Sequence, residues 1–321
     1  MADHMTIERG FENLHGFDPS DVSIVIPVLN AGSHADQQIA ALSRQGFPAE
    51  CYLIVDSSST DGSPARFAAQ GMEVLIIKKS DFNHGGTRRM AVEHRPNAKF
   101  VVMMTQDAIP SHDRSLANIL DGFADQMVGL SYGRQLPRPT ARGIERHARL
   151  MNYPADSEVR SMAESKHLGI KMTFCSNSFA AYRKSALEAV GNFPQDSYFA
   201  EDQVVAGRML MEGWKIAYQA DASVVHSHGY TIAEDFRRYF DVGVFHARNG
   251  WLLNAYGTAE GEGLRFIRSE QGFLLKNDIR QIPSALVRTP AKYLAYRLGK
   301  LESRLSNKAK RLFSMQPFYW K

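Results

Sequence analysis

Cysteine and long apolar runs are both scarce in this sequence of 321 residues. Its two cysteines, Cys51 and Cys175, are too few for a disulfide scaffold or a cysteine-rich zinc site, so a reducing, cytoplasmic compartment is expected. The longest apolar runs, such as VSIVIP and CYLIV, are about six or seven residues long, whereas a membrane-spanning helix needs roughly 20. The polar N-terminus lacks the apolar core of a secretion signal. The sequence therefore predicts neither a membrane span nor a secretion signal.

The composition is that of a soluble globular protein. Hydrophobic residues make up 44% of the sequence and charged residues 22%, which provides enough apolar side chains for a substantial core. Disordered, collagen-like and coiled-coil chains are excluded on this ground. At roughly 150 residues per domain, the length fits one large domain, or a domain with an appendage.

The net charge of +4 is unevenly distributed along the chain. Nine Lys and Arg residues and a single acid, Glu302, lie between residues 284 and 321 and give this tail a charge of +8. Residues 1–283 therefore carry a net charge of −4, since the whole chain carries +4. Because the basicity belongs to one segment and not to a face of the main domain, no nucleic-acid partner is expected.

From residue 22 to about residue 132, short β-branched runs alternate with segments that suit helices. The runs are apolar on both faces, as the central strands of a parallel sheet are. The predicted strands cover 22–27, 51–56, 74–78, 100–105 and 128–132, and the predicted helices cover roughly 33–45, 63–70, 87–94 and 113–125. This alternation predicts an α/β fold with an open, mostly parallel sheet flanked by helices.

The second half of the chain is less regular. We expect an irregular excursion over 134–173, a strand over 176–182, a helix over 201–213, a pair of short strands over 215–228 and helices from about residue 231 onward. In the first of these last helices, Phe236 and Phe240 lie four residues apart, and we expect both in the core.

Polar or turn-forming residues follow three of the predicted strands, at the point where each strand ends. Pro27 and Leu29 mark the end of the first strand, Asp56 ends the second, and Gln106 and Asp107 follow the fourth. In open α/β sheets the ligand site gathers beyond the carboxyl ends of the strands. These residues are therefore expected to converge on one cleft.

Two short motifs offer groups for a nucleotide. Asp56, at the end of an apolar strand, could accept the imide N–H of a pyrimidine, while Asp61 in the following turn could simply cap a helix. The segment DFNHGGTRR, 81–89, opens a helix with a glycine pair whose N–H groups, together with Arg88, could seat a diphosphate. A plain glycine turn with a surface arginine is the alternative.

Two further motifs carry acids and histidines. In VVHSHGY, 224–230, His226 and His228 alternate in a strand and would share a face, so that with Asp107 they could hold Mn²⁺ or Mg²⁺. Two histidines without a third ligand are more often structural. In FAEDQ, 199–203, Glu201 and Asp202 open a helix, where they could favour the helix dipole or provide a general base.

The motifs together resemble a known family. The order VSIVIPVLN, VDSSSTDGS, FNHGGTRR, TQDA, FAEDQ and VVHSH, over about residues 21 to 250, is similar to the inverting family 2 glycosyltransferases with a GT-A fold, and among them to the bacterial rhamnosyltransferases. The resemblance implies a GT-A catalytic domain over 21–260, preceded by an N-terminal extension (1–20) and followed by a basic helical region (261–321).

The resemblance also implies a role for each motif residue. The donor would be bound by Pro27, Leu29, Asp56, Asp61, Gly86, Arg88 and Gln106. A divalent metal would be bound by Asp107 with His226 or His228. Asp202 would be the catalytic base, and Glu201 would orient acceptor hydroxyls. Within the donor site, Pro27, Leu29 and Asp56 would form the nucleobase pocket, and Gly86 and Arg88 would lie along the ribose or diphosphate. Thr105 stands where the family's metal motif begins with aspartate, so this loop offers one carboxylate fewer.

The function implied is inverting transfer of L-rhamnose from dTDP-L-rhamnose to a polysaccharide or lipid-linked oligosaccharide at the cytoplasmic face of the bacterial inner membrane. Transfer from UDP-hexose or UDP-galactofuranose in the same fold is one alternative. A non-catalytic protein that binds nucleotide sugars or carbohydrates is another.

The basic tail offers a second surface. Leu294, Leu298, Leu301, Leu305 and Leu312 would form one apolar stripe of a continuous helix with a cationic flank, and the aromatic residues 318–320 follow it. Such a helix suits peripheral contact with an anionic membrane. Packing on the catalytic domain, or a seam between two copies in a homo-oligomer, is the equal alternative.

Overall fold

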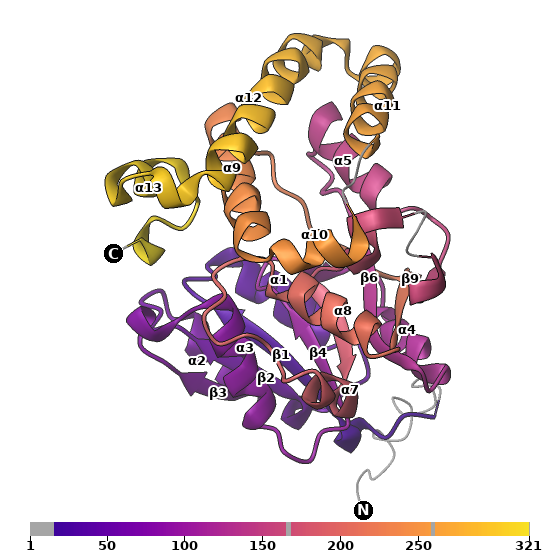
Figure 1. Cartoon of the computed structure of the whole chain (residues 1–321). Helices are drawn as coiled ribbons and strands as arrows, with labels where there is room; N and C mark the ends of the chain where they lie inside the picture. Colours follow the sequence, from indigo (N-terminus) through magenta and orange to yellow (C-terminus); the bar gives the residue numbers. More distant parts are fainter. Residues whose placement is uncertain (1–15, 165–167, 258–260, 321) are drawn as a thin grey trace, which may run out of the picture.

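The computed structural model describes residues 16–164, 168–257 and 261–320 (Figure 1). Its centre is a nine-stranded sheet in the order β3-β2-β1-β4-β8-β6-β9-β5, with β7 added against β9. The strands are β1 (Val22–Val28), β2 (Tyr52–Asp56), β3 (Glu73–Ile76), β4 (Phe100–Met104), β5 (Ile109–Pro110), β6 (Val128–Leu136), β7 (Glu158–Arg160), β8 (Phe179–Arg183) and β9 (Lys215–Val225).

Helices cover both faces of the sheet and extend beyond it. They are α1 (Ser33–Leu42), α2 (Ser63–Ala68), α3 (His84–Glu93), α4 (Ser115–Leu120), α5 (Gly143–Asn152), α7 (Lys184–Ala189), α8 (Glu201–Met211), α9 (Ile232–Arg248), α10 (Gly250–Tyr256), α11 (Glu262–Asn277), α12 (Ile282–Lys300) and α13 (Asn307–Phe313). Within the described residues, no helix is both long enough and apolar enough to span a bilayer.

The α/β fold is confirmed, but the sheet is mixed. The strands β3, β2, β1 and β4 run parallel, as expected, whereas β8 is antiparallel to both of its neighbours, β4 and β6. Segment 74–78 was expected to be a central strand, which is wrong, because β3 lies at the sheet edge and Ile76 is 66% exposed. The two short strands expected over 215–228 form one strand, β9, whose pairing with β6 is interrupted by a register shift after Gln219.

The two faces of the sheet bury separate apolar clusters. Ile24 and Ile26 of β1 point into one cluster and Val25, between them, points into the other. Alternate residues of a strand face opposite sides of its sheet, so a strand covered on both sides must be apolar throughout. This explains why β1, β2 and β4 were recognisable from the sequence.

Because β8 is antiparallel to its neighbours, its N-terminal end lies at the edge of the sheet where their C-terminal ends lie. Phe179, the first residue of β8, pairs with Met104, the last residue of β4. The exits of β1, β2, β4, β6 and β9 and the segment just before β8 therefore lie along a single edge. The structure thereby brings polar residues from both halves of the chain to this edge.

The C-terminal helices pack on α9 and α5, not on the sheet (Figure 1). At the crossing of α9 and α12, Gly243 and Gly299 meet so closely that a Cβ on Gly299 would lie 2.1 Å from the carbonyl oxygen of Phe240. Phe240 is fully buried, as expected, and Phe236 is partly buried against the same cluster.

The leucine stripe expected in the tail is not formed, because α12 ends at Lys300 and a turn separates it from α13. Leu298 and Leu305 pack inward, whereas Leu294, Leu301 and Leu312 are exposed. A membrane helix running through residue 312 is therefore excluded.

The last aromatic residues form a C-terminal clamp, defined here as Tyr319 and Trp320 packed on Tyr198. The Tyr319 and Tyr198 rings stack with their centroids 4.2 Å apart, and Trp320, only 5% exposed, meets Tyr198 edge-on. Phe318, in contrast, is 90% exposed. Of the three terminal aromatics expected at a membrane interface, the structure thus leaves one fully available.

Candidate active site

The exits of β1 and β4 are tied together by Gln106. Its side-chain Oε1 accepts from the backbone N–H of Leu29 at 2.7 Å, and its Nε2 donates to the Leu29 carbonyl at 3.2 Å. Pro27, two residues earlier, pairs with Val55 of β2. The structure thus brings Pro27, Leu29 and Gln106 to one edge, as expected.

Asp56 ends β2 and organises the turn that follows. Its carboxylate accepts from the Ser59 hydroxyl at 2.5 Å and from the Ser59 N–H at 2.9 Å, and the Ser59 hydroxyl oxygen accepts from the Asn30 N–H at 2.8 Å. Asn30 and Ser58 both have positive φ, +48° and +62°. Such strain in non-glycine residues gathers at functional sites, and here it shapes the two neighbouring strand exits.

Asp61 braces two loops. Its carboxylate accepts from the N–H groups of Gly32 at 2.7 Å and Ser63 at 3.0 Å, and from the Ser63 hydroxyl at 2.6 Å. These bonds, those to Ser63 above all, lower the pKa of Asp61 to about 2. Asp61 therefore caps the start of α2, which was the alternative role expected for it. It also holds α2 against the loop after β1 and so helps to shape the site.

The glycine pair of α3 lies beneath a loop, residues 194–200. Gly85 donates its N–H to the Ser197 carbonyl at 3.0 Å, and Gly86 donates its N–H to the Asn83 side chain at 2.6 Å. A Cβ on Gly85 would lie 1.9 Å from the Pro194 carbonyl oxygen. The glycines are thus required for close packing, and both N–H groups are engaged within the protein.

Arg88 is buried together with Glu201. The guanidinium is 3% exposed, lies 3.0 Å from the Glu201 carboxylate and donates to the His84 carbonyl at 3.0 Å. Burial alone would raise the pKa of Glu201, but Arg88, with His84 and Asn177, holds it below its ordinary value. The pair locks α3 to α8, and the role at a diphosphate expected for Arg88 and Gly86 stays a prediction.

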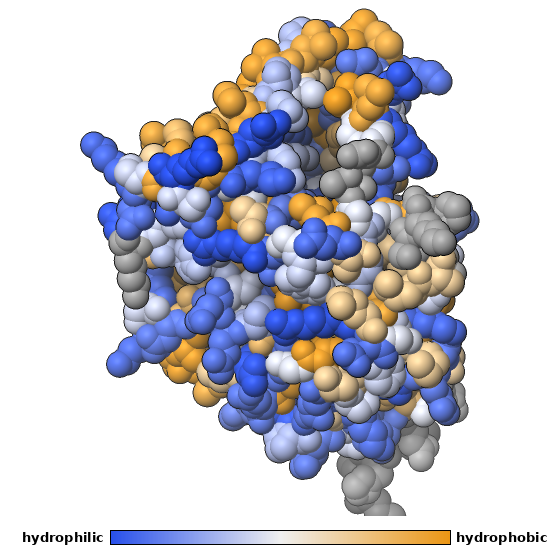
Figure 2. Space-filling model, viewed as in Figure 1, coloured by the Kyte–Doolittle hydropathy of each residue, from blue (hydrophilic) through white to orange (hydrophobic). Residues whose placement is uncertain are grey.

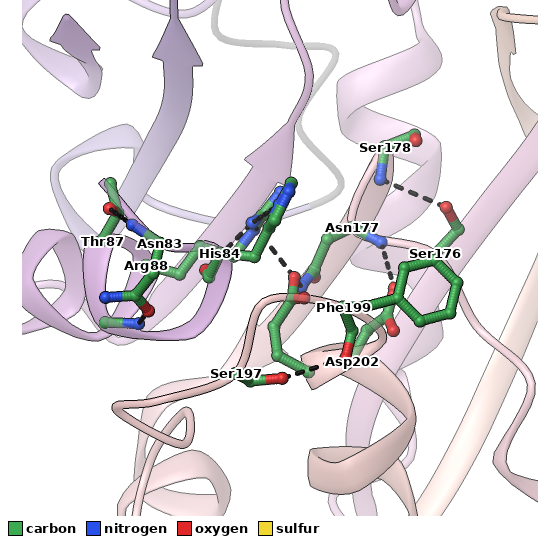
Figure 3. A network of polar contacts seen from close by, with 12 residues as sticks. Asn83, His84, Thr87, Arg88, Ser176, Asn177, Ser178, Ser197, Phe199 and Asp202 are labelled. Carbon is green, nitrogen blue, oxygen red and sulfur yellow. Dashed lines mark hydrogen bonds and ion pairs between the residues drawn. The ribbon is translucent and has the colours of Figure 1, made fainter. Parts of the chain in front are cut away.

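Asn177, just before β8, binds Asp202 (Figure 3) and also the neighbouring Glu201. The Asn177 side chain donates to Glu201 at 2.8 Å and its backbone N–H donates to Asp202 at 3.0 Å. Tyr182 in turn donates its hydroxyl to the Asn177 side chain at 2.7 Å. Ala200, with φ +54°, turns the chain sharply into α8. Both carboxylates are thus held in fixed positions.

The pKa of Asp202 is raised to about 7. Burial is the largest cause and the charge of Glu201 the second, and both outweigh the stabilising N–H donors of Asn177 and Gln203. A carboxylate with a pKa near neutrality can take up a proton during a reaction and release it afterwards. Asp202 therefore has the properties of a general base.

Asp107, His226 and His228 form a cluster at the exits of β4 and β9. One ligand atom from each lies within 4.8 Å of the others, and each imidazole Nε2 lies 3.4 Å from an Asp107 oxygen. Burial alone would raise the pKa of Asp107, but His226, Thr105 and His228 lower it overall. Burial, with the neighbouring His226, lowers the pKa of His228 to about 4, so its imidazole is neutral near pH 7.

A second layer orients His226. The Gln135 side-chain oxygen lies 2.9 Å from Nδ1 of His226 and accepts from Arg149 at 2.9 Å. An amide oxygen can only accept, so Nδ1 of His226 carries a proton, and this hydrogen bond fixes the ring with Nε2 toward Asp107. One carboxylate and two imidazoles in this arrangement fit a divalent cation.

The acid pair and the His–Asp cluster border the same sheet edge. Thr105, two residues before Asp107, donates its backbone N–H to the Ser178 carbonyl at 3.4 Å, and Ser178 adjoins Asn177. The residues expected to meet at one cleft therefore lie around one continuous run of strand ends, where a nucleotide, a cation and a base could act together.

A family model, "Glycosyl transferase family 2", matches residues 23–191 of the chain. The chain belongs to this family. The match confirms the resemblance drawn from the motifs. It spans β1 to α7 and so includes the exits of β1, β2 and β4, whereas Asp202, His226 and His228 lie beyond it.

Two curated relatives match this glycosyltransferase over nearly its whole length. The O-antigen chain rhamnosyltransferase WbaN of Salmonella anatum is 45% identical over 93% of this chain and 95% of its own length. The O-antigen chain rhamnosyltransferase RfbN of Salmonella typhimurium is 42% identical over 93% of this chain and 96% of its own. At this level of identity the family assignment covers nearly the whole chain.

Solved structures share the fold of the glycosyltransferase at lower identity. A mannosyltransferase from Pyrobaculum calidifontis, in complex with GDP-Man and Mn²⁺, has a TM-score of 0.55 at 22% identity and covers 94% of this chain and 86% of that one. A glucosyl-3-phosphoglycerate synthase from Mycobacterium tuberculosis, with Mn²⁺, UDP-Glc and phosphoglyceric acid, has a TM-score of 0.51 at 16% identity and covers 81% and 87%. The GT-A-type fold is thereby confirmed.

Several residues of the glycosyltransferase site were missed by the sequence analysis. Asn177, which bridges the two acids, lies in a segment recognised as a strand with no chemistry attached. Gln135 and Arg149 come from the irregular excursion. No local pattern marks these residues, because their partners are distant in the sequence.

Proposed function

We propose that this glycosyltransferase moves L-rhamnose from dTDP-L-rhamnose to a saccharide acceptor of a surface polysaccharide such as O-antigen. The names and the 45% and 42% identities of the two Salmonella relatives support the sugar and the pathway class. UDP-hexose and UDP-galactofuranose are the alternative donors. The acceptor would be a polysaccharide or a lipid-linked oligosaccharide at the cytoplasmic face of the inner membrane.

The nucleotide would bind at the exits of β1 and β2. Pro27 and Leu29 would contact the base, and Asp56 would accept the imide N–H of thymine with a lone pair that Ser59 leaves unused, since a carboxylate offers about four acceptor sites. Asp61 and Gln106 would keep the two loops in place through the bonds they make to Gly32 and Leu29.

The Asp107, His226 and His228 cluster would hold a divalent cation. Imidazole ligands favour manganese over magnesium, whereas carboxylate oxygen suits both. A bound cation would offset the charge that develops on the leaving diphosphate. Gln135 and Arg149 would fix the imidazole that faces this cation.

Asp202 would act as the base in an inverting displacement. The acceptor oxygen forms a bond to C1 of the sugar, the bond from C1 to the diphosphate oxygen breaks with its electron pair on the nucleotide, and the hydroxyl proton moves to Asp202. Attack from the face opposite the nucleotide inverts the anomeric centre. Glu201 and Arg88 would act through position, because they are buried and paired with each other.

The observation that carries this proposal is that Asp202, held by Asn177, borders the same run of strand ends as the His–Asp cluster. Replacing Asp202 with Asn should abolish rhamnosyl transfer and leave dTDP-rhamnose binding, measured by calorimetry, largely unchanged. Asp196→Asn, an exposed change on the loop just before, serves as the matched control. Loss of donor affinity in the Asp202 variant would instead assign this residue to the donor site.

The donor is tested with a panel of dTDP-rhamnose, UDP-glucose, UDP-galactose and GDP-mannose, each with and without Mn²⁺, by calorimetry or thermal shift. We expect the tightest binding for dTDP-rhamnose. A preference for the guanine nucleotide, which the Pyrobaculum enzyme binds, would reject the pyrimidine pocket. Binding of a donor without transfer to any saccharide acceptor would favour the non-catalytic alternative.

A further inference from the structure

Helix α12 turns its apolar side to solvent. Its outer face is defined here by side chains that all lie within roughly a third of the helix circumference. These are Pro283, Leu286, Val287, Pro290, Tyr293 and Leu294. The four large ones among them are between 54% and 62% exposed. Exposed apolar residues are ordinary when scattered, but a continuous stripe over three turns marks an interaction surface.

Two of the four charged residues of α12, Arg288 and Lys292, lie on its opposite side. Arg288 and Lys292 point toward α9, where both pair with Asp235, which is 5% exposed. The residues buried beside them are small: Ala285, Ala295 and Gly299. The helix is thus inverted relative to an ordinary surface helix, because its contact with the protein is partly ionic and its solvent side is apolar.

The surroundings of the outer face are cationic. Within the described residues 261–301, six Lys and Arg side chains are exposed, whereas each of the three acids is at least partly covered. The exposed cations are Arg265, Arg268, Lys276, Arg280, Arg297 and Lys300. Glu262 pairs with Lys171 and Arg265, and Glu270 is 5% exposed. Figure 2 shows hydrophobic (orange) and hydrophilic (blue) residues interleaved at the top of the molecule, where Figure 1 places α11 and α12.

We propose that the outer face of α12, extended by the exposed Leu275 and Ile279 at the end of α11, binds the surface of a lipid bilayer that contains anionic lipid. Apolar side chains would enter the boundary between headgroups and acyl chains, and the surrounding cations would meet the lipid phosphates. The surface is separate from the sheet edge and goes beyond the proposed function.

Charge complementarity favours a membrane over a second copy of the chain. A two-fold contact places the same patch on both sides of the interface. Across such a contact Arg297 and Lys300 would face the same cations, with no exposed acid of 261–301 to pair with them. An anionic bilayer offers the opposite charge to all six.

Flotation with two kinds of vesicle tests the proposal: phosphatidylcholine alone, and phosphatidylcholine with phosphatidylglycerol. We expect the full chain to float with the anionic vesicles, and the L286E/L294E variant to bind them at least tenfold more weakly. Arg297→Gln with Lys300→Gln should weaken binding and reduce its dependence on salt. The matched control is I76E/M127E, which adds two acids at exposed apolar sites elsewhere and should bind like the wild type.

Thermal unfolding and donor binding of each variant accompany the flotation assay. Unchanged donor binding in L286E/L294E separates this surface from the nucleotide site, so that failure of one proposal leaves the other standing. Equal flotation of L286E/L294E and the wild type would overturn the membrane proposal. So would a wild-type dimer in lipid-free buffer that L286E/L294E converts to a monomer, because the face would then be a contact between copies.

Discussion

The sharpest consequence of the buried acid pair concerns how activity depends on pH. If Asp202 is the base, it acts in its ionised form, and kcat/KM should rise with pH around its pKa of about 7. Part of that elevated pKa comes from the negative charge of Glu201. Replacing Glu201 with Gln removes this charge and leaves in place the cation of Arg88, which already lowers the pKa of Asp202, so that pKa should fall.

The size of the shift follows from the geometry. One asparagine, Asn177, binds both carboxylates, so the two charges lie near each other. Two unit charges separated by about 6 Å interact by about 2.8 kcal/mol at an effective dielectric constant of about 20. Since 1.36 kcal/mol corresponds to one pH unit, the rising limb should move down by about one to two units. The base would then be largely ionised at pH 7.

The assay is the pH profile of rhamnosyl transfer between pH 4.5 and 9 for the wild type and for Glu201→Gln. The position of the limb is read and not the maximal rate, because loss of an acceptor contact would change the rate alone. Glu212→Gln, an exposed change just past the other end of α8, should leave the limb in place. A Glu201→Gln profile whose limb stays near 7 would refute the assignment of Asp202 as the titrating base.

Three further outcomes are expected. Arg88→Met leaves Glu201 buried without its cation and should lower the free energy of unfolding by about 3–5 kcal/mol in urea titrations; Arg44→Met, in an exposed pair, should cost no more than about 1 kcal/mol. Mn²⁺ at a hundredfold excess over its Kd should raise the free energy of unfolding of the wild type by about 2.7 kcal/mol and so raise its Tm. The variant His226→Ala should abolish this rise in Tm, whereas the exposed His34→Ala should not. Gly299→Ala should lower the free energy of unfolding by about 1–3 kcal/mol, whereas Gly272→Ala, with open space around it, should not.

The sequence predicted the parallel half of the sheet well, for a physical reason. Strands β1, β2 and β4 are buried on both faces, so their whole apolar runs are visible without knowledge of neighbours. Segment 74–78 has the same pattern but lies at the edge of the sheet, and strand order is a property of pairing between distant segments. The antiparallel insertion of β8 was beyond prediction for the same reason.

The sequence predicted which residues belong to the site better than it predicted which of them contact one another. Asp107, His226 and His228 meet as expected, because β5, which begins two residues after Asp107, pairs with the end of β9. The partner of Arg88 could not be foreseen, since Glu201 lies 113 positions away and reaches it only after α8 docks on α3. A charged side chain in a helix looks the same in the sequence whether it faces a ligand or a buried counter-ion.

If Asp202 is the base, the C-terminal clamp should make turnover sensitive to changes far from the reacting groups. Tyr198, which Tyr319 and Trp320 hold, lies four residues before Asp202 on the loop that also covers the glycine pair of α3. Proteolytic trimming of the tail, or a purification tag fused behind it, would loosen this loop while every side chain of the pocket stayed intact. A preparation processed in that way would lose rate and keep its affinity for nucleotide, and could be mistaken for an inactive homologue.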